Sequence, residues 1–238
     1  MSTWGAAMLD VADLDLKYGQ SQILYGVSFT AELGAVTAVM GTNGVGKTSL
    51  LKAIAGRHPA SGGAITLDGQ PAAVSNAYDA ARLGIAYVPQ GREVFPMMSV
   101  QENLETGFAC LPKDKRTIPD EVFDLFPVLK DMLGRRGGDL SGGQQQQLAI
   151  ARALITQPRV LLLDEPTEGI QPNIIQQIGD AIQLLRDRGT MAIVLVEQNA
   201  DFAYRIADRF VMMTRGAVTR DTVKADYSRD ALLEDLAI

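Results

Sequence analysis

Glycines and a lysine at a fixed spacing mark the part of this chain whose residue types are best suited to chemistry. The stretch matches G-x-x-x-x-G-K-[ST], the phosphate-binding P-loop. Its residues are Gly41, Thr42, Asn43, Gly44, Val45, Gly46, Lys47, Thr48 and Ser49. The glycines allow backbone N–H groups to turn inward around phosphates, and the helix that follows adds the positive end of its dipole. The pattern predicts a nucleoside triphosphate site, with Lys47 on the β- and γ-phosphates and Thr48 on Mg²⁺.

Two carboxylates form the second candidate group. Asp164 and Glu165 directly follow the apolar run Val160–Leu163, which has the composition of a buried strand. Ligand sites of α/β proteins lie at the carboxyl ends of such strands. We expect Asp164 to hold Mg²⁺. Where the chain turns at the end of the strand, we expect Glu165 to polarise the attacking water as a general base.

A serine and two glycines begin a predicted helix about 95 residues after the P-loop. The sequence there is Leu140-Ser141-Gly142-Gly143-Gln144. This helix start is a second candidate anion site, because its N–H groups and its dipole favour phosphate. Two phosphate sites in one small domain are explained if the second contacts a nucleotide that is held by another subunit.

Alternating strand and helix patterns must position these residues. Apolar runs predict strands at 9–18, 23–31, 35–40, 64–67, 85–88, 160–163, 191–196 and 209–213. Helical spacing and capping residues predict helices at 48–56, 76–83, 100–108, 119–126, 129–133, 143–155, 173–188, 200–207 and 229–236.

These elements predict an α/β fold with a P-loop NTPase core, in which helices flank a mostly parallel sheet. An N-terminal antiparallel β subdomain and an inserted helical subdomain complete it. We expect residues 1–238 to form a single nucleotide-binding domain. Its core lobe comprises 1–90 and 158–238, and its helical subdomain comprises 91–157, including the helix that begins at Ser141.

Composition narrows the possible functions. The 238 residues carry a net charge of −6 with a pI near 4.9, which argues against a general nucleic-acid binder. Cys110 is the only cysteine, so no intramolecular disulfide can form. The only histidine, His58, removes His-cluster metal sites, and we expect it in a surface loop. No apolar run of about 18 residues predicts a membrane span, and Met1–Asp10 lacks the features of a secretory signal.

These motifs, taken in order, resemble those of the nucleotide-binding subunits of ATP-binding cassette (ABC) transporters. The resemblance extends over essentially the whole chain, and its LSGGQ signature is highly specific for this family. It implies a head-to-tail dimer, with each ATP between the P-loop of one subunit and the signature of the other. The motifs that carry it are Gly41–Thr48, Gln90, Leu140–Gln144 and Val160–Glu165.

The resemblance also assigns roles to residues outside these motifs. Tyr18 matches the aromatic residue that stacks on adenine, with a core tyrosine at a strand end as the alternative. Gln90 matches the glutamine that contacts Mg²⁺ or the attacking water and links the core to the helical subdomain. The implied cofactors are ATP and Mg²⁺.

Two positions depart from the family pattern. The switch position after the last core strand is usually histidine, but here it is Gln198. Glutamine can hydrogen-bond a γ-phosphate oxygen, but it cannot become a cation or shuttle a proton. Gln171 replaces the usual aspartate of the loop after Glu165, so communication across the dimer loses one carboxylate. We therefore expect catalytic roles for Gln90 and Gln198 but a larger share of the chemistry for Lys47 and Glu165.

Several stretches indicate a subgroup. Residues 165–170 and 196–199 resemble the second ATPase of branched-chain (hydrophobic) amino-acid importers. Residues 90–96, 125–130, 135–139, 144–147 and 167–172 are most similar to the urea-type importer ATPase. The expected function is ATP hydrolysis that drives uptake of urea or a related small amide. A branched-chain amino-acid importer is the alternative, and a soluble ABC protein, an exporter and a P-loop kinase are rival classes.

An importer subunit of this kind implies particular partners. We expect two transmembrane permeases, a second homologous ATPase in a heterodimer, and indirectly a solute-binding protein outside the cell. The isolated chain could form a homodimer, and nucleic acid is not an expected partner. The implied location is the cytoplasmic face of the cell membrane, as a peripheral protein. Candidate residues for a groove that receives permease helices, with core packing as the alternative, are Phe95, Met97, Met98 and Phe108.

Overall fold

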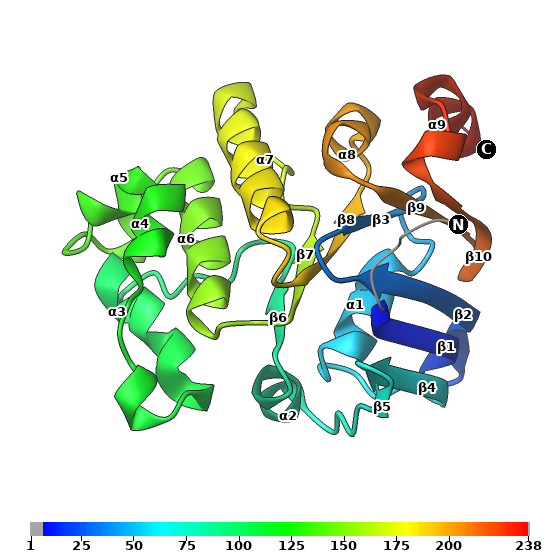
Figure 1. The fold of residues 1–238 in the computed structure, drawn as a ribbon, viewed down its shortest axis with the longest axis horizontal. Helices are drawn as coiled ribbons and strands as arrows, with labels where there is room; N and C mark the ends of the chain where they lie inside the picture. Colours follow the sequence, from blue (N-terminus) through cyan, green and yellow to red (C-terminus); the bar gives the residue numbers. More distant parts are fainter. Residues whose placement is uncertain (1–6, 238) are drawn as a thin grey trace.

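Two β-sheets, with helices between and around them, form the part of the chain that the computed structural model describes, residues 7–237 (Figure 1). Residues 1–6 lie outside that part, so most of the segment expected to lack a secretory signal is not described. The first sheet is antiparallel, with strand order β2-β1-β4-β5. Its strands are β1 (Ala7–Tyr18), β2 (Ser21–Glu32), β4 (Gly62–Leu67) and β5 (Gln70–Pro71).

The second sheet has the order β10-β9-β3-β8-β7-β6 and is parallel except for β10, which pairs antiparallel with β9. Strands β3, β7 and β8 are buried along their whole length, which explains their nearly continuous apolar sequences. Met40 pairs with Glu197, and Asp164 pairs with Val196. The loops after these three strands therefore meet at one edge. The strands are β3 (Val36–Met40), β6 (Ile85–Val88), β7 (Val160–Asp164), β8 (Ala192–Glu197), β9 (Arg209–Thr214) and β10 (Ala217–Val223).

Helix α1 (Lys47–Ile54) lies between the two sheets (Figure 1). Its Leu50 and Ile54 are fully buried in a cluster that includes Leu16 of the first sheet and Val39 of the second. Each such side chain contributes about 1.5–3 kcal/mol by leaving water. The helix that follows the P-loop is thus held from both sides.

Other helices cover the opposite face of the six-stranded sheet. On α7, Ile178, Ile182 and Leu185 follow helical spacing and are fully buried against that sheet. Within residues 7–237, no helix has both the length and the apolar composition that crossing a membrane requires. The helices of this face and of the sheet edges are α2 (Ala77–Arg82), α6 (Gly142–Ile155), α7 (Pro172–Asp187), α8 (Ala200–Ile206) and α9 (Arg229–Leu236).

The remaining helices lie together with α6 at one end of the molecule (Figure 1). They are α3 (Val100–Glu105), α4 (Asp120–Leu125) and α5 (Pro127–Lys130). A capping box of Ser99 and Glu102 begins α3. The buried Asn103 amide donates hydrogen bonds to the carbonyl oxygens of Phe95, Met98 and Ser99. This side chain therefore holds the preceding loop against α3.

The architecture agrees with the prediction, and the boundary errors lie mainly in this group of helices. The helix predicted at 100–108 ends at Glu105 and continues as a 3₁₀ turn from Thr106 to Cys110. This turn requires the glycine at position 107, because a Cβ there would lie 2.8 Å from the Ile155 side chain of α6. The turn therefore packs closely on α6.

Two short elements also differ from the prediction. The helix predicted at 129–133 is α5, Pro127–Lys130, and it begins at a proline, which is favoured in the first helical turn. Strand β5 was not predicted, because two residues are too few to produce an alternating pattern. A turn at Arg215 and Gly216 leads from β9 into β10.

Candidate nucleotide site

The P-loop connects β3 to α1, and its glycines Gly41, Gly44 and Gly46 all have positive φ values, which other residues rarely adopt; at two of them a side chain would also clash. Gly41 has a φ of 151°, and a Cβ there would lie 2.4 Å from the carbonyl oxygen of Met213. Gly46 is the N-cap of α1 with a φ of 106°, and a Cβ there would lie 2.8 Å from Leu24. Both positions therefore require glycine. Among the described residues no side chain caps α1, so its first N–H groups can bind an anion.

Lys47 is buried inside this loop, with only 4% of its side chain exposed. Its Nζ donates hydrogen bonds to the carbonyl oxygens of Gly41 at 2.7 Å and Thr42 at 3.0 Å. Burial lowers the pKa of the ammonium group, although the nearby Glu165 and Asp164 oppose that shift. A bound phosphate would therefore compete with two carbonyl oxygens for this cation.

Asp164 ends β7 beside the P-loop and is buried. The Thr48 hydroxyl donates to one of its carboxylate oxygens at 3.1 Å, and the Tyr87 hydroxyl donates to the other at 2.9 Å. Burial raises the pKa of Asp164 and that of Tyr87. A buried carboxylate beside a hydroxyl offers the oxygen ligands that Mg²⁺ prefers, so Thr48 and Asp164 fit the metal that was predicted for them.

Glu165 begins a turn at the end of β7. Its φ of 47° is in the left-handed region, and its N–H still donates to the carbonyl oxygen of Val196 at 2.9 Å. Its side chain faces the same cavity as Lys47 and Thr48, as predicted from the turn of the chain. A carboxylate oxygen lies 3.9 Å from Lys47 Nζ. Backbone conformations of this kind cost about 1–3 kcal/mol and are frequent at functional sites.

Two glutamine side chains reach Glu165. Nε2 of Gln198 donates to Oε1 at 2.5 Å, and Nε2 of Gln90 lies 3.4 Å from Oε2. Gln90 Nε2 also donates to Glu168 at 3.0 Å, and Arg92 donates to the Glu168 carbonyl oxygen at 3.3 Å. The two glutamines are predicted site residues. The positions of Glu168 and Arg92 depend on the paths of two loops, which no sequence pattern specifies.

An open cavity of about 300 Å³ lies over these groups. Tyr18 lies at its rim and is 41% exposed, so an adenine ring has access to it. His58 packs edge-on against Tyr18, with ring centroids 4.3 Å apart. The sequence predicted only a surface-loop histidine, and the structure shows it half-buried against a predicted site residue. The cavity lining comprises Tyr18, Ile23, Asn43, Gly44, Gly46, Lys47, Thr48, Ser49, Gln90 and Glu165.

The LSGGQ residues lie elsewhere. Ser141 is the N-cap of α6, and it forms a capping box with Gln144 at 3.3 and 2.9 Å. Gly142 faces the Arg92 guanidinium, 3.0 Å from where a Cβ would lie, and Gly143 packs tightly against α7. In the described part of the chain, none of these residues lines the cavity beside Lys47. Their contact with a nucleotide of another subunit stays a prediction.

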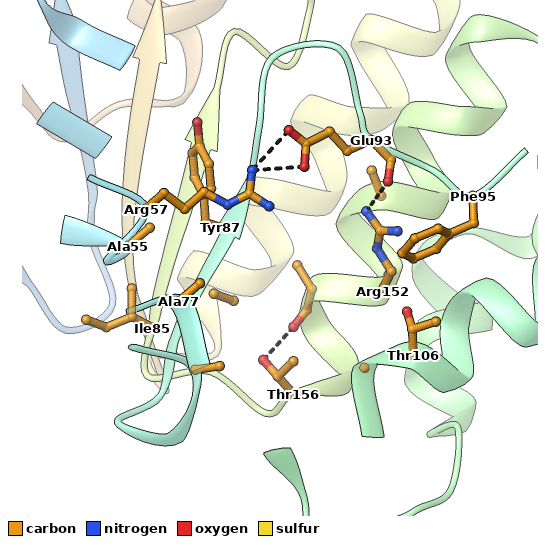
Figure 2. A pocket seen from close by; sticks show the side chains of 15 residues that line it. Ala55, Arg57, Ala77, Ile85, Tyr87, Glu93, Phe95, Thr106, Arg152 and Thr156 are labelled. Atoms are coloured by element: carbon orange, nitrogen blue, oxygen red, sulfur yellow. Dashed lines mark hydrogen bonds and ion pairs between the residues drawn. The ribbon is translucent and has the colours of Figure 1, made fainter. Parts of the chain in front are cut away.

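A second cavity, of about 350 Å³, lies between the core and the group of helices at the end of the molecule (Figure 2). Arg57 and Glu93 form an ion pair beside it, in which one guanidinium nitrogen, Nη1, lies 3.0 and 2.9 Å from the two carboxylate oxygens. Arg152 of α6 donates to the carbonyl oxygens of Glu93 at 2.9 Å and Arg92 at 3.3 Å. Its guanidinium lies 5.4 Å from the centre of the Phe95 ring.

The apolar residues predicted to form a groove behave differently from one another. Phe95 lines this second cavity and is 46% exposed. Met97 is exposed on the same loop, and Met98 is half-buried beside it. Phe108 packs against the hydrophobic core, so the alternative of core packing is correct for this residue.

Known proteins match the chain in sequence. A family model described as ABC transporter matches residues 24–168. The high-affinity branched-chain amino acid transport ATP-binding protein BraG of Pseudomonas aeruginosa is 41% identical over 212 residues, which are 89% of this chain and 91% of that protein. The probable branched-chain amino acid transport ATP-binding protein LivF of Archaeoglobus fulgidus is 38% identical over 214 residues, which are 89% and 90% of the two chains.

Solved structures match the fold. A nucleotide-free ATP-binding cassette from an ABC transporter has a TM-score of 0.82, with 22% identity and coverage of 98% of this chain and 96% of that one. An ATP-binding cassette of an ABC transporter in its ADP conformation has a TM-score of 0.78 at 25% identity, covering 97% and 95%. These likenesses confirm the predicted fold class.

Proposed function

The chain belongs to the ABC transporter family, and we propose that it is the ATPase subunit of an importer for branched-chain amino acids. It is an ABC ATPase and the ATP-binding subunit of an importer. The observation that supports the solute is the 41% identity to BraG over 89% of this chain. Urea was the solute expected from several short stretches, but these relatives do not support it. The branched-chain amino-acid importer, which was the alternative, replaces it.

The proposed chemistry uses groups at the edge where β3, β7 and β8 end. The N–H groups at the start of α1 and the Lys47 ammonium bind the phosphates. Mg²⁺, held by Thr48 and Asp164, would neutralise the charge that develops on the phosphates. Glu165 accepts the proton of the attacking water as the general base. Gln198 donates to Glu165 at 2.5 Å and orients its carboxylate. Since an amide cannot take up the proton of the water, the role of Gln198 is limited to such hydrogen bonds.

Tyr18 and Gln90 complete the proposed site. Tyr18 stacks on adenine from the rim of the cavity. The Nε2 group of Gln90 faces Glu165 and Glu168, which leaves its carbonyl oxygen for Mg²⁺ or the attacking water. Gln90 also leads into the helical subdomain of the proposed division, with 91–157 inserted between the core segments 1–90 and 158–238 of one nucleotide-binding domain.

Another subunit supplies the second half of each site in this proposal. The support is the position of Ser141, Gly142, Gly143 and Gln144, which lie outside the cavity that holds Lys47 of their own chain. Each helix start would then contact the nucleotide of the opposite subunit, head to tail. The proposed partner is a second, homologous ATPase, and a homodimer of the isolated chain is the alternative arrangement of the same kind.

The cavity beside Phe95 is the proposed contact with two transmembrane permeases. It lies at the junction of the core and the helices, where a change in their arrangement would reach a partner (Figure 2). The exposed Met97 and the ring of Phe95 offer apolar contacts there. The subunit would be peripheral, on the cytoplasmic face of the cell membrane, and a solute-binding protein outside the cell would act only through the permeases.

Uptake by cells that lack this subunit tests the proposal. Deletion of its gene from the source cell should abolish uptake of labelled leucine, isoleucine and valine and leave urea uptake unchanged. The wild-type chain should restore uptake. The Glu165→Gln chain should not, because it lacks the proposed base. In the purified variant we expect ATP binding to persist and steady-state hydrolysis to fall about 10²–10⁴-fold.

A matched control makes this test specific. Glu168→Gln makes the same change three residues further on, and its amide oxygen still offers Gln90 an acceptor, so near-normal hydrolysis is expected. Loss of urea uptake with intact leucine uptake would return the solute to urea. Undiminished hydrolysis by Glu165→Gln would remove this residue as the base.

A further inference from the structure

A buried carboxylate without a predicted role lies at the end of β8. Glu197 is only 2% exposed, and it pairs in register with Met40, the residue before the P-loop. No apolar pattern predicts it, because Ala192–Val196 before it is an uninterrupted apolar run. A charged group at such a place is costly unless several donors surround it.

Each carboxylate oxygen of Glu197 accepts two hydrogen bonds. Oε1 accepts from the Thr167 N–H at 3.2 Å and from the Thr167 hydroxyl at 2.7 Å. Oε2 accepts from the N–H groups of Gln198 at 3.0 Å and Asn199 at 3.1 Å. Only a carboxylate satisfies this pattern, because a glutamine amide would direct an NH₂ group at existing donors.

The four donors come from two different loops. Thr167 belongs to the loop that follows β7 and Glu165, whereas Gln198 and Asn199 begin the loop that follows β8. Asn199 in turn caps α8 by accepting from the Phe202 N–H at 3.0 Å. Glu197 thus connects the two loops at the edge of the sheet and also fixes the start of a helix.

Both loops reach Glu165, the proposed base. In the loop after β8, the backbone N–H of Gln198 donates to Glu197, and the side-chain Nε2 of the same residue donates to Glu165 at 2.5 Å. The loop after β7 begins at Glu165 itself, whose φ of 47° is a conformation that the surroundings must maintain. Glu197 therefore holds Gln198, which contacts Glu165 through its side chain, and Thr167, which lies two residues after Glu165 in the same loop.

We propose that Glu197 is a positioning residue for ATP hydrolysis, which holds Gln198 and the loop of Thr167 so that Glu165 points at the attacking water. The proposal rests on the proposed role of Glu165 as the base. Glu197 acts through Gln198 and the Thr167 loop and does not itself touch the nucleotide. Its effect is expected in the chemical step and not in the binding of ATP.

Steady-state kinetics of Glu197→Gln tests this role. The variant keeps the size of the side chain but directs an NH₂ group at two donors, so Gln198 and Thr167 cannot both keep their positions. We expect kcat to fall about tenfold or more while the KM for ATP changes less than about twofold, since only transition-state contacts are weakened. Binding of a fluorescent ATP analogue and the thermal midpoint of unfolding establish that the variant is folded.

A double-mutant cycle separates positioning from general loss of structure. Because part of its action runs through Gln198, the change Glu197→Gln should lower kcat clearly less in a Gln198→Ala chain than in the wild type. Multiplied effects of the two changes, or an unchanged kcat in either single variant, would overturn the proposal. If Glu197→Gln does not fold, Thr167→Val replaces it in the cycle, because it removes only the hydroxyl donor at 2.7 Å.

Two controls complete the experiment. Thr37→Val also removes a buried hydroxyl, and that hydroxyl has no hydrogen-bond partner among the described residues, so kcat should stay unchanged. Glu165→Gln distinguishes the two levels of inference. A nearly inactive Glu165→Gln chain with a fully active Glu197→Gln chain would reject only the role of Glu197. A fully active Glu165→Gln chain would reject the proposed base as well.

Discussion

At the scale of single residues, the contact between Tyr18 and His58 bears on the proposed stacking of adenine on Tyr18. The two rings meet edge to face at 4.3 Å and 70°, a favourable geometry for aromatic pairs. His58 Nδ1 lies 3.0 Å from the Pro59 carbonyl oxygen, so the imidazole has a second anchor. A partly exposed tyrosine gains a defined orientation from this support, and a stacked adenine would benefit from it.

We expect His58→Ala to raise the KM for ATP about 2–10-fold and to leave kcat unchanged. The reason is the loss of an aromatic contact that contributes about 0.5–1.5 kcal/mol to the position of Tyr18. Steady-state hydrolysis at a series of ATP concentrations measures both constants. His58→Phe should keep the wild-type KM, and an equal rise in both variants would argue against the aromatic support.

The buried carboxylate of Glu197 also makes the stability of the fold depend on pH. Burial raises its pKa above the usual 4.5, although its hydrogen bonds oppose the shift. At pH values between 4.5, the pKa in the unfolded chain, and the higher pKa of the folded protein, the folded protein binds more protons at this group than the unfolded chain. Its contribution to stability is therefore complete below pH about 4.5 and is lost as the pH rises through the folded pKa.

We expect the free energy of unfolding of the wild type, relative to Glu197→Gln, to decrease as the pH rises over this interval. Taking the difference between the two chains removes the titration of the other carboxylates. Urea denaturation at a series of pH values gives that difference. A difference that is independent of pH would show that the pKa of Glu197 is the same in the folded and unfolded chain.

At the scale of elements, α3 and α6 begin with the same device. Ser99 with Glu102, and Ser141 with Gln144, form capping boxes whose serine hydroxyls accept from the backbone at the third helical position. Both starts are therefore structural caps, but only α6 begins with the residues of the signature. This similarity provides a matched pair of variants for the proposed dimer.

We expect Ser141→Arg to prevent ATP-dependent dimers, because a long cation at this helix start would obstruct a nucleotide of the opposite subunit. Ser99→Arg should also lose about 1 kcal/mol of helix capping but should still dimerise. Size-exclusion chromatography with ATP, in a Glu165→Gln background that slows hydrolysis, measures the dimer. Dimers of Ser141→Arg under these conditions would contradict the shared site.

The elements themselves were largely predictable from the sequence. Continuous apolar runs identified β7 and β8, and the P-loop pattern placed Lys47 and Thr48 between a strand and a helix, because these signals are local. Contacts of Tyr87 and Glu197 were not predictable, since they depend on which strands are neighbours and in which register. The close packing of Gly107 on α6, just after the end of α3, was also not predictable, because it joins segments far apart in the sequence.

At the scale of the whole molecule, the segment between the core and the group of helices is bent. Gly91, Arg92 and Glu93 all have positive φ values, of 82°, 70° and 46°. An arginine from each side holds this bend: Arg57 pairs with the Glu93 carboxylate, and Arg152 of α6 donates to the backbone (Figure 2). The two parts of the molecule are therefore joined by an exposed ion pair, Arg57 with Glu93, and by the half-buried Arg152.

We expect Arg152→Ala to lower the free energy of unfolding by about 1–3 kcal/mol, because it leaves two carbonyl oxygens without their donor. Glu93→Gln should cost only about 0–1 kcal/mol, since its ion pair with Arg57 is exposed to solvent. Urea denaturation measures both values. Arg159→Ala, which removes an arginine from an exposed ion pair with Asp68, is the control and should resemble Glu93→Gln. A larger loss in Glu93→Gln than in Arg152→Ala would contradict this order.

If each site is shared between two chains, as proposed from the position of Ser141 outside the cavity of its own chain, the activity of a given amount of protein depends on its concentration. A chain whose active site needs a second chain follows mass action: in dilute solution the rate per molecule rises with concentration and levels off when pairing is complete. Permeases that hold two such subunits side by side replace bulk concentration by a high local one. The number of assembled permeases, more than the amount of this subunit in the cell, would then set the total rate of ATP consumption.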